Sequence, residues 1–290
     1  DVLDEEDLKN LNNKCTNLID HGINRNNINS QLQKFKILNI PFGGPDLSKI
    51  IYNIKFASEV VLLNNKLIEL LLRGIIPINN MGLYNNDIKD SNILYNKSDN
   101  AIRIIDWGLS GISTKTNPIP KIIISRPFQY NIPFTIILFH QNFTKFYSSA
   151  LAKLQYTNSP SFSEIKNIVF NFMKEYKLNA KGHYNYIINN LIPKVLAIDK
   201  VKEILKEKIQ TSKWNELDII LEYITTVLIT YTDFRKREFL RNKYFIQVYS
   251  KNIDVWGFIM IYMEYIDNYK NNNFKKIFSS LHQDTEKKFI

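Results

Sequence analysis

Four polar residues near the middle of the chain have the types and spacing that phosphoryl transfer requires. That reaction needs a carboxylate to accept the proton of the attacking hydroxyl, a cation near the moving phosphate, and oxygen ligands for Mg²⁺. Asp87 can orient the hydroxyl, and Lys89 can point to the same side of an extended loop because it follows two residues later. Asn92 follows Asp87 by 5 positions (92 − 87), Asp106 follows Asn92 by 14 (106 − 92), and these two side chains can hold the metal.

A two-stranded hairpin between Asn92 and Asp106 would bring these side chains together. Ile93–Tyr95 and Ile102–Ile105 are short apolar runs separated by a polar turn, which is the pattern of paired strands. The hairpin returns Asp106 beside Asn92, and Gly108 frees the backbone just after it. An ordinary surface loop in which Asp106 caps a turn is the alternative.

Apolar patterning elsewhere predicts an α+β chain that is mainly helical. A short apolar run that meets a Gly-Gly-Pro turn predicts a strand over Lys34–Pro41. The Pro-rich segment Ser113–Pro133 is expected to be extended or irregular, because each proline removes a donor and disfavours helix before it. The expected helices cover Ala57–Arg73, Phe162–Tyr176, Val195–Ile209 and Asp254–Tyr265.

Composition bounds the class of protein. The 290 residues, 44% of them hydrophobic, are enough to bury a real core. No apolar stretch approaches the ~20 residues of a bilayer crossing, and a single cysteine with four dispersed histidines makes neither an internal disulfide nor a zinc site. We therefore expect an intracellular, cytoplasmic chain without a membrane partner. The net charge of +10 favours anionic partners such as nucleotides, acidic protein surfaces or nucleic acid, although scattered lysines also fit a plain solvated surface.

The segments D-I-K-D-S-N, over Asp87–Asn92, and D-W-G, over Asp106–Gly108, resemble a known pair of motifs. They are similar to the catalytic loop H-R-D-L-K-x-x-N and the metal-binding turn D-F-G of eukaryotic-type serine/threonine protein kinases. The resemblance implies a kinase-like large lobe that uses ATP and Mg²⁺ and transfers the γ-phosphate to Ser or Thr hydroxyls of proteins. It makes Asp87 and Lys89 catalytic, and it makes Asn92 and Asp106 the metal ligands.

The source class is also indicated by resemblance. The Asn-, Ile- and Lys-rich composition and the string I-D-W-G-L-S-G resemble divergent kinases of large AT-rich DNA viruses, including giant viruses. A viral kinase would act in the host cytoplasm or in the virion. Composition alone suits an AT-rich protist equally.

Two further segments resemble kinase landmarks in the family's order. Tyr249–Gly257 is similar to the start of the central helix of the large lobe, which makes Asp254 the acceptor of hydrogen bonds from the catalytic-loop backbone. A plain N-cap role for Asp254 is compatible with this reading and stays open. Lys34–Leu47 is similar to the fifth strand, the hinge and the turn into the next helix, which implies adenine contacts from Asn39, Ile40, Pro41 and Phe42.

The chain departs from the kinase pattern at several positions. Asn85 and Asn86 stand where the family has His and Arg, so the usual reason for a phosphate-dependent switch is absent. Arg126–Phe134 best matches the end of the activation segment, with Pro133 at the proline of A-P-E. Phe134 replaces the glutamate of that motif, which removes the usual buried ion pair.

The predicted domains are a partial small lobe with hinge (1–45), a kinase-like large lobe (46–134), a helical insertion (135–248), and the central helix with an abbreviated end of the lobe (249–290). No Gly-rich loop or lysine-bearing strand precedes Lys34, so we expect either that the front of the small lobe is outside this chain or that the kinase is reduced. The resemblance implies that Asp4–Leu18 is the helix of the small lobe. The insertion, over Thr135–Arg241, is expected to pack as its own helical unit. Its apolar stripe is expected to form core and comprises Ile165, Val169, Phe172 and Met173.

Two rivals to a protein kinase remain. A pseudokinase would keep the fold and bind partners through the insertion, whereas a small-molecule phosphotransferase would phosphorylate a metabolite. The expected partner is a protein substrate, acidic in one reading, and nucleic acid is a further option without a motif of its own. The groups that could bind such an anion are Arg235, Lys236, Arg237, Arg241 and Lys243.

Overall fold

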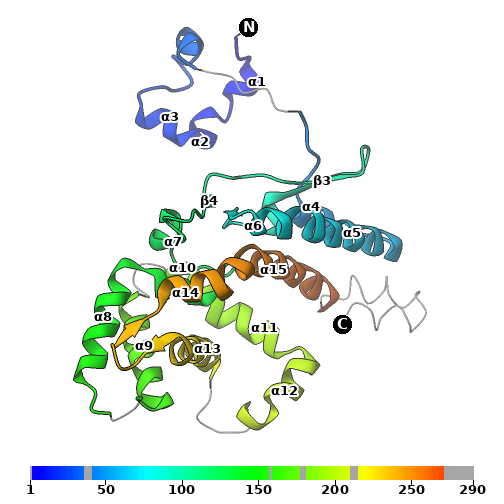
Figure 1. Cartoon of the computed structure of the whole chain (residues 1–290). Coiled ribbons are helices and arrows are strands. Elements are labelled where there is room, and N and C mark those ends of the chain that lie inside the picture. The colour runs from blue at the N-terminus through cyan, green and yellow to red at the C-terminus, as the bar shows by residue number, and fades with distance from the viewer. Residues whose placement is uncertain (1, 36–40, 157–158, 177–180, 210–214, 271–290) are drawn as a thin grey trace. The chain divides into compact units, whose positions relative to one another are not determined.

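The computed structural model describes residues 2–35, 41–156, 159–176, 181–209 and 215–270. The chain divides into two compact units, Asp1–Phe42 and Gly43–Ile290. The described residues are α+β and mainly helical, as predicted, and the strands form three separate two-stranded sheets (Figure 1).

The first unit contains short helices around a small core. We expected one helix over Asp4–Leu18, and this was wrong. The helix is interrupted at Cys15, whose backbone is not helical, with φ of −120° and ψ of 49°. The elements are α1 (Glu5–Leu8), α2 (Leu11–Lys14), α3 (Thr16–Asp20) and a 3₁₀ turn over Asn29–Lys34. The buried residues of this unit are Leu8, Leu11, Ile23 and Ile28. Most of the strand expected over Lys34–Pro41 falls on residues 36–40, outside the described residues.

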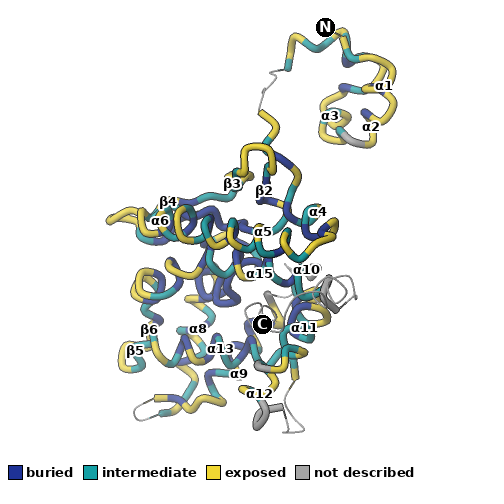
Figure 2. The backbone as a smooth tube through the Cα atoms, turned by 90° about the vertical axis from the view of Figure 1, so that its right-hand side faces the viewer, coloured by how far each residue is buried: buried dark blue, intermediate teal, exposed yellow. Residues whose placement is uncertain are grey.

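Helix α15 (Ser250–Lys270) runs through the second unit between two groups of helices (Figures 1 and 2). Ile253 packs into one hydrophobic core, and Phe258 packs into the other. The helix predicted over Asp254–Tyr265 is therefore confirmed and is longer than expected. Asp254 lies inside α15 and not before it, so the N-cap reading was wrong.

On one side of α15 lie α4 (Leu47–Tyr52), α5 (Ala57–Leu70) and α6 (Ile76–Asn80). We expected the helix that begins at Ala57 to close at Gly74. Instead a π-helical turn over Leu71–Ile75 joins α5 to α6. Pro77 is tolerated because it stands in the first turn of α6, where a missing N–H costs no helical bond.

The predicted hairpin is confirmed. Strands β2 (Ile93–Asn96) and β3 (Ala101–Ile104) pair antiparallel, with Ile93 opposite Ile104. A second pair, β1 (Leu83–Tyr84) with β4 (Gly111–Ile112), brackets the loop and the hairpin between its strands. The polypeptide from 85 to 110 thereby lies between two paired strands.

On the other side of α15 one continuous core joins the expected insertion to the rest of the second unit. Phe128 and Ile132, which precede the insertion, share this core with Ile165 of α9 and with Tyr249. We expected residues 135–241 to pack as a separate unit, but they share one core and one compact unit with the rest of this region. The predicted stripe is buried, with Ile165, Val169, Phe172 and Met173 all in this core. The helices are α7 (Lys121–Ser125), α8 (Gln141–Lys153), α9 (Phe162–Tyr176), α10 (Lys181–Tyr186), α11 (Ile192–Leu196), α12 (Asp199–Ile209), α13 (Glu216–Tyr231) and α14 (Arg241–Tyr244), with a 3₁₀ turn over Phe134–Phe139 and π-helical turns over Ile187–Leu191 and Phe245–Tyr249.

Two expected segments differ in detail. Helix α7 interrupts the extended stretch expected over Ser113–Pro133, because Pro120 stands just before its first residue, where a proline does not break a helix. The helix expected over Val195–Ile209 is broken, since α11 ends at Leu196 and α12 begins at Asp199. A short hairpin of β5 (Thr232–Asp233) and β6 (Glu238–Phe239) precedes α14. Within the described ranges no helix is long and apolar enough to span a membrane.

Candidate active site

The loop that carries Asp87 is bound by Asp254 of α15. Its Oδ2 accepts the backbone N–H of Asn85, and its Oδ1 accepts the backbone N–H of Asn86, each at 2.8 Å. These are the hydrogen bonds that the kinase resemblance implied. Burial raises the pKa of Asp254 to about 6, although the two N–H donors oppose the shift. The carboxylate thus holds the loop by two hydrogen bonds, while burial disfavours its charged form.

The carboxylate of Asp87 receives four hydrogen bonds. Oδ1 accepts from Arg126 Nη2 at 3.0 Å and from Asn131 Nδ2 at 2.9 Å. Oδ2 accepts from Lys89 Nζ at 2.9 Å and from Asn92 Nδ2 at 3.0 Å. The structure therefore brings together three of the predicted residues, Asp87, Lys89 and Asn92, and adds two that were not predicted.

Asp87 is held in its ionised form. Burial alone would raise the pKa of this carboxyl, but the hydrogen bonds from Asn131 and Lys89, together with the charges of Lys89 and Arg126, outweigh it. The pKa of Asp87 therefore lies below its ordinary value. Asp87 and Asp254 are both buried, yet their pKa values move in opposite directions because only Asp87 faces cations.

Asn85 and Asn86 have structural roles in place of the family's His and Arg. Asn85 Nδ2 donates to the carbonyl of Asp106 at 3.2 Å, which ties the loop to the D-W-G turn. Asn86 takes a left-handed backbone conformation, with φ of 64°, and its Nδ2 donates to the carbonyl of Leu109 at 2.8 Å. Asparagine is among the residues that accept this conformation most readily.

The D-W-G turn has a geometry that differs from our expectation. Asp106 itself takes the left-handed conformation, with φ of 57°, so the backbone freedom expected from Gly108 was assigned to the wrong residue. Gly108 contributes its N–H, which donates to Asp106 Oδ1 at 3.3 Å. The backbone N–H of Ile105 donates to the carbonyl of Asn92 at 2.9 Å, so the hairpin returns the chain beside Asn92 as predicted.

The two expected metal ligands fit Mg²⁺ in their donor chemistry. An amide oxygen and a carboxylate are hard oxygen ligands, and Mg²⁺ is commonly held by one or two protein groups plus phosphate oxygens and water. Asn92 uses its Nδ2 for Asp87, which leaves Oδ1 available, and the Asp106 side chain is exposed. In the described part of the chain no cluster of three or more His, Cys, Asp or Glu side chains could hold a metal by itself. Nucleotide phosphates would have to complete the site.

The residues expected to contact adenine all precede the second unit. Asn39 and Ile40 lie outside the described residues. Pro41 and Phe42 end the first unit and are exposed, Phe42 by 80%. Adenine binding at these four residues therefore stays a prediction.

An aromatic cluster stands where the family's buried ion pair would be. Phe134 packs against Phe128, with ring centroids 5.4 Å apart, and against Trp256 of α15 at 5.0 Å. Helix α10 contacts the same segment, since Tyr130 and Tyr186 lie 5.4 Å apart. The expected insertion thus helps to hold the segment that ends at Phe134.

Arg126 and Asn131 are the residues that sequence reasoning missed. They were noted only as part of a segment resembling the end of the activation segment. A signal existed, because Arg126 is a lone arginine in an apolar and Pro-rich stretch, where an unpaired charge would be costly to bury. Nothing local could have indicated which acid pairs with it.

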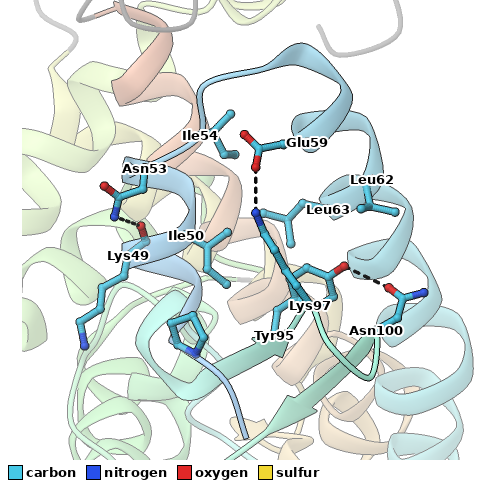
Figure 3. Close-up of a pocket in the computed structure, with 11 residues that line it drawn as sticks. Lys49, Ile50, Asn53, Ile54, Glu59, Leu62, Leu63, Tyr95, Lys97 and Asn100 are labelled. Atoms are coloured by element: carbon cyan, nitrogen blue, oxygen red, sulfur yellow. Dashed lines mark hydrogen bonds and ion pairs between the residues drawn. The ribbon is translucent and has the colours of Figure 1, made fainter.

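A separate pocket lies elsewhere in the second unit (Figure 3). It is a cavity of about 690 Å³ between α4, α5 and the β2–β3 hairpin. Its apolar floor includes Ile54 and Leu63, and Lys97 reaches across it to Glu59 at 2.8 Å. None of the residues lining it belongs to the Asp87 cluster, so the candidate site is separate from this cavity.

No family model matches the chain, and no curated protein matches it in sequence.

Proposed function

We propose that the second unit transfers the γ-phosphate of ATP to a Ser or Thr hydroxyl of a protein substrate. The observation that carries the proposal is the ionised, buried carboxylate of Asp87, whose Oδ2 is shared by Lys89 and Asn92. An ionised carboxylate can accept the proton of the attacking hydroxyl, and Lys89 beside it can bind the phosphate that is transferred.

The proposed step is a direct transfer. The hydroxyl oxygen of the substrate attacks the γ-phosphorus, and a new O–P bond forms as the bond to the bridging oxygen of ADP breaks. The hydroxyl proton passes to Oδ2 of Asp87. Lys89 leaves that oxygen to bind the γ-phosphate, which frees the acceptor position that the substrate needs.

Asn92 Oδ1 and the Asp106 carboxylate would hold Mg²⁺, which supplies positive charge to the phosphates. This charge supports the departure of ADP. Lys89 would supply further positive charge to the phosphates. Its side chain is 29% exposed, so it can exchange Asp87 for the γ-phosphate.

The test compares Asp87→Asn with wild type in the full protein. We expect phosphotransfer to a Ser/Thr peptide library to fall by at least ~10², the scale for loss of a positioned base, with ATP affinity nearly unchanged. Asp99→Asn is the matched control, because Asp99 is an exposed acid of the hairpin turn that pairs with Arg103. Wild-type turnover in Asp87→Asn would contradict the proposal.

Two outcomes would favour the rival functions. Binding of Mg·ATP without transfer to any acceptor would indicate a pseudokinase. Transfer to a small hydroxylated metabolite, and not to peptides, would indicate a small-molecule phosphotransferase. The assay therefore includes both a peptide library and a pool of metabolites.

A further inference from the structure

Arg126 lies directly after α7 and points into the catalytic loop. Its Nη2 donates to Asp87 Oδ1 and to the carbonyl oxygen of Asn86, both at 3.0 Å. The side chains of this pair are 5% and 8% exposed. A buried charge pair of this kind is costly to form, and removal of one partner leaves the other charge buried and uncompensated.

We propose that Arg126 is the positioning residue for Asp87, and that it ties the segment after the D-W-G turn to the catalytic loop without a phosphate. The inference rests on the proposed function for its catalytic meaning. Its geometric content, that a guanidinium orients Asp87, stands independently.

The four donors to Asp87 divide into two pairs of different origin. Arg126 and Asn131, from the segment after the D-W-G turn, both bond to Oδ1. Lys89 and Asn92, from the loop itself, both bond to Oδ2. A carboxylate offers about four acceptor positions, so Asp87 has none to spare. Oδ1 is therefore the oxygen that is held, and Oδ2 is the one that can exchange Lys89 for a substrate hydroxyl.

The arginine that joins the two segments lies on the opposite segment from the one that carries it in the kinase pattern. In kinases the arginine stands in the catalytic loop, at the position that is Asn86 here. In this chain the arginine is Arg126, in the segment after the D-W-G turn, and it donates to the carbonyl oxygen of Asn86. The positive charge and the acidic partner are both already in the chain. Ordering the segment against the loop therefore needs no added phosphate.

Arginine suits this place better than lysine does. Its planar group presents several donors in fixed directions and stays protonated in proteins, although burial lowers its pKa and the charge of Asp87 opposes that shift. Lysine would keep the charge but lose the fixed directions.

Other titratable groups also lie in this electrostatic environment. The groups that interact with Asp87 or Arg126 are Lys89, Asp106, Tyr130, His183 and Tyr249. Burial and the charges of Arg126 and Lys89 lower the pKa of His183 of α10. The variants are therefore compared at one fixed pH.

The test combines a structural and a kinetic measurement on wild type, Arg126→Gln, Arg126→Lys and the control Arg103→Gln. The structural measurement is the ¹³C chemical shift of the Asp87 carboxyl at one fixed pH, assigned with Asp87→Asn, and we expect it to change in both Arg126 variants and not in Arg103→Gln. In the kinase assay kcat should fall by ~10–10²-fold in both Arg126 variants, the scale for misplacing a reacting group, with the KM for Mg·ATP unchanged. Phosphatase treatment should leave wild-type activity unchanged.

The outcomes separate the inference from the proposed function. An inactive wild type whose Asp87 carboxyl chemical shift still changes in Arg126→Gln would sink the kinase proposal and keep the positioning role. An active wild type that has the same Asp87 chemical shift and the same kcat as Arg126→Gln would overturn the positioning role alone, and loss of activity on dephosphorylation would overturn the phosphate-free tie. If Arg126→Gln does not fold, full kcat in Arg126→Lys would overturn the inference.

Discussion

Gly257 of α15 lies directly against the backbone of Ile88 in the catalytic loop. A Cβ atom at position 257 would stand 2.5 Å from the carbonyl oxygen of Ile88 and 2.9 Å from that of Asn131. Both distances are shorter than carbon and oxygen atoms allow, so the close approach requires glycine. This contact sets the distance between the central helix and the loop that carries Asp87.

Gly257→Ala should therefore push the loop away from α15. We expect a loss of about 1–3 kcal/mol in the free energy of unfolding, the scale for overpacking, together with reduced phosphotransfer. Gly74→Ala is the matched control, because its added Cβ would meet only the end of the Leu70 side chain at 3.3 Å. Urea denaturation of both variants checks the prediction, and equal stability would show that the loop adapts without cost.

Asp106→Asn should abolish, or nearly abolish, Mg²⁺-dependent binding of ATP. In the described structure Asp106 is the carboxylate that the D-W-G turn presents beside Asn92, and an amide is a much weaker partner for Mg²⁺. Calorimetry with Mg·ATP, and with ATP in EDTA, provides the measurement. Equal Mg·ATP affinity in both proteins, or a wild-type ATP affinity in EDTA as high as with Mg²⁺, would contradict the metal assignment.

Asp254 should make stability depend on pH with a defined sign. Its pKa is about 6 in the folded chain and ~3.9 when unfolded, so the folded chain binds the proton more tightly. Its favourable contribution is thus complete below about pH 4 and is lost as the pH rises through 6. Relative to Asp254→Asn, wild type should lose up to about 3 kcal/mol between pH 3 and pH 7. Urea denaturation across this range tests it, and a constant difference would show that burial does not raise the pKa.

The basic residues around the β5–β6 turn should bind anions in a salt-dependent way. Arg235, Lys236 and Arg237 form this turn and are exposed, and Arg241 and Lys243 follow in α14. Changing all five to glutamine should weaken binding to a poly-glutamate peptide or to duplex DNA, lower the salt dependence of that binding, and spare ATP affinity.

A control with the same change in net charge distinguishes a local site from a general surface effect. Its substitutions to glutamine are at Lys55, Lys115, Lys121, Lys145 and Lys153, all exposed. If both variants bind equally well, the β5–β6 turn is an ordinary solvated surface.

Local patterns predicted the parts of the site that are close in sequence. The hairpin between Asn92 and Asp106 follows from two apolar runs and a turn, and the structure has it in the expected place. The contacts of Arg126 and Asn131 with Asp87 join residues 39 and 44 positions apart, and no periodicity encodes such pairing. The shared core was missed for the same reason, because helical stripes show that a helix is buried but not which partner covers it.

The hydrogen bonds from Asn85 and Asn86 to Asp254 span 169 and 168 positions. A loop of this length is entropically expensive to close, so it closes late relative to local helices and hairpins. During synthesis the N-terminal part of the second unit leaves the ribosome long before Asp254 does. A nascent chain that already contains Asp87, Asn92 and Asp106 therefore still lacks the hydrogen bonds from Asp254 that hold this loop.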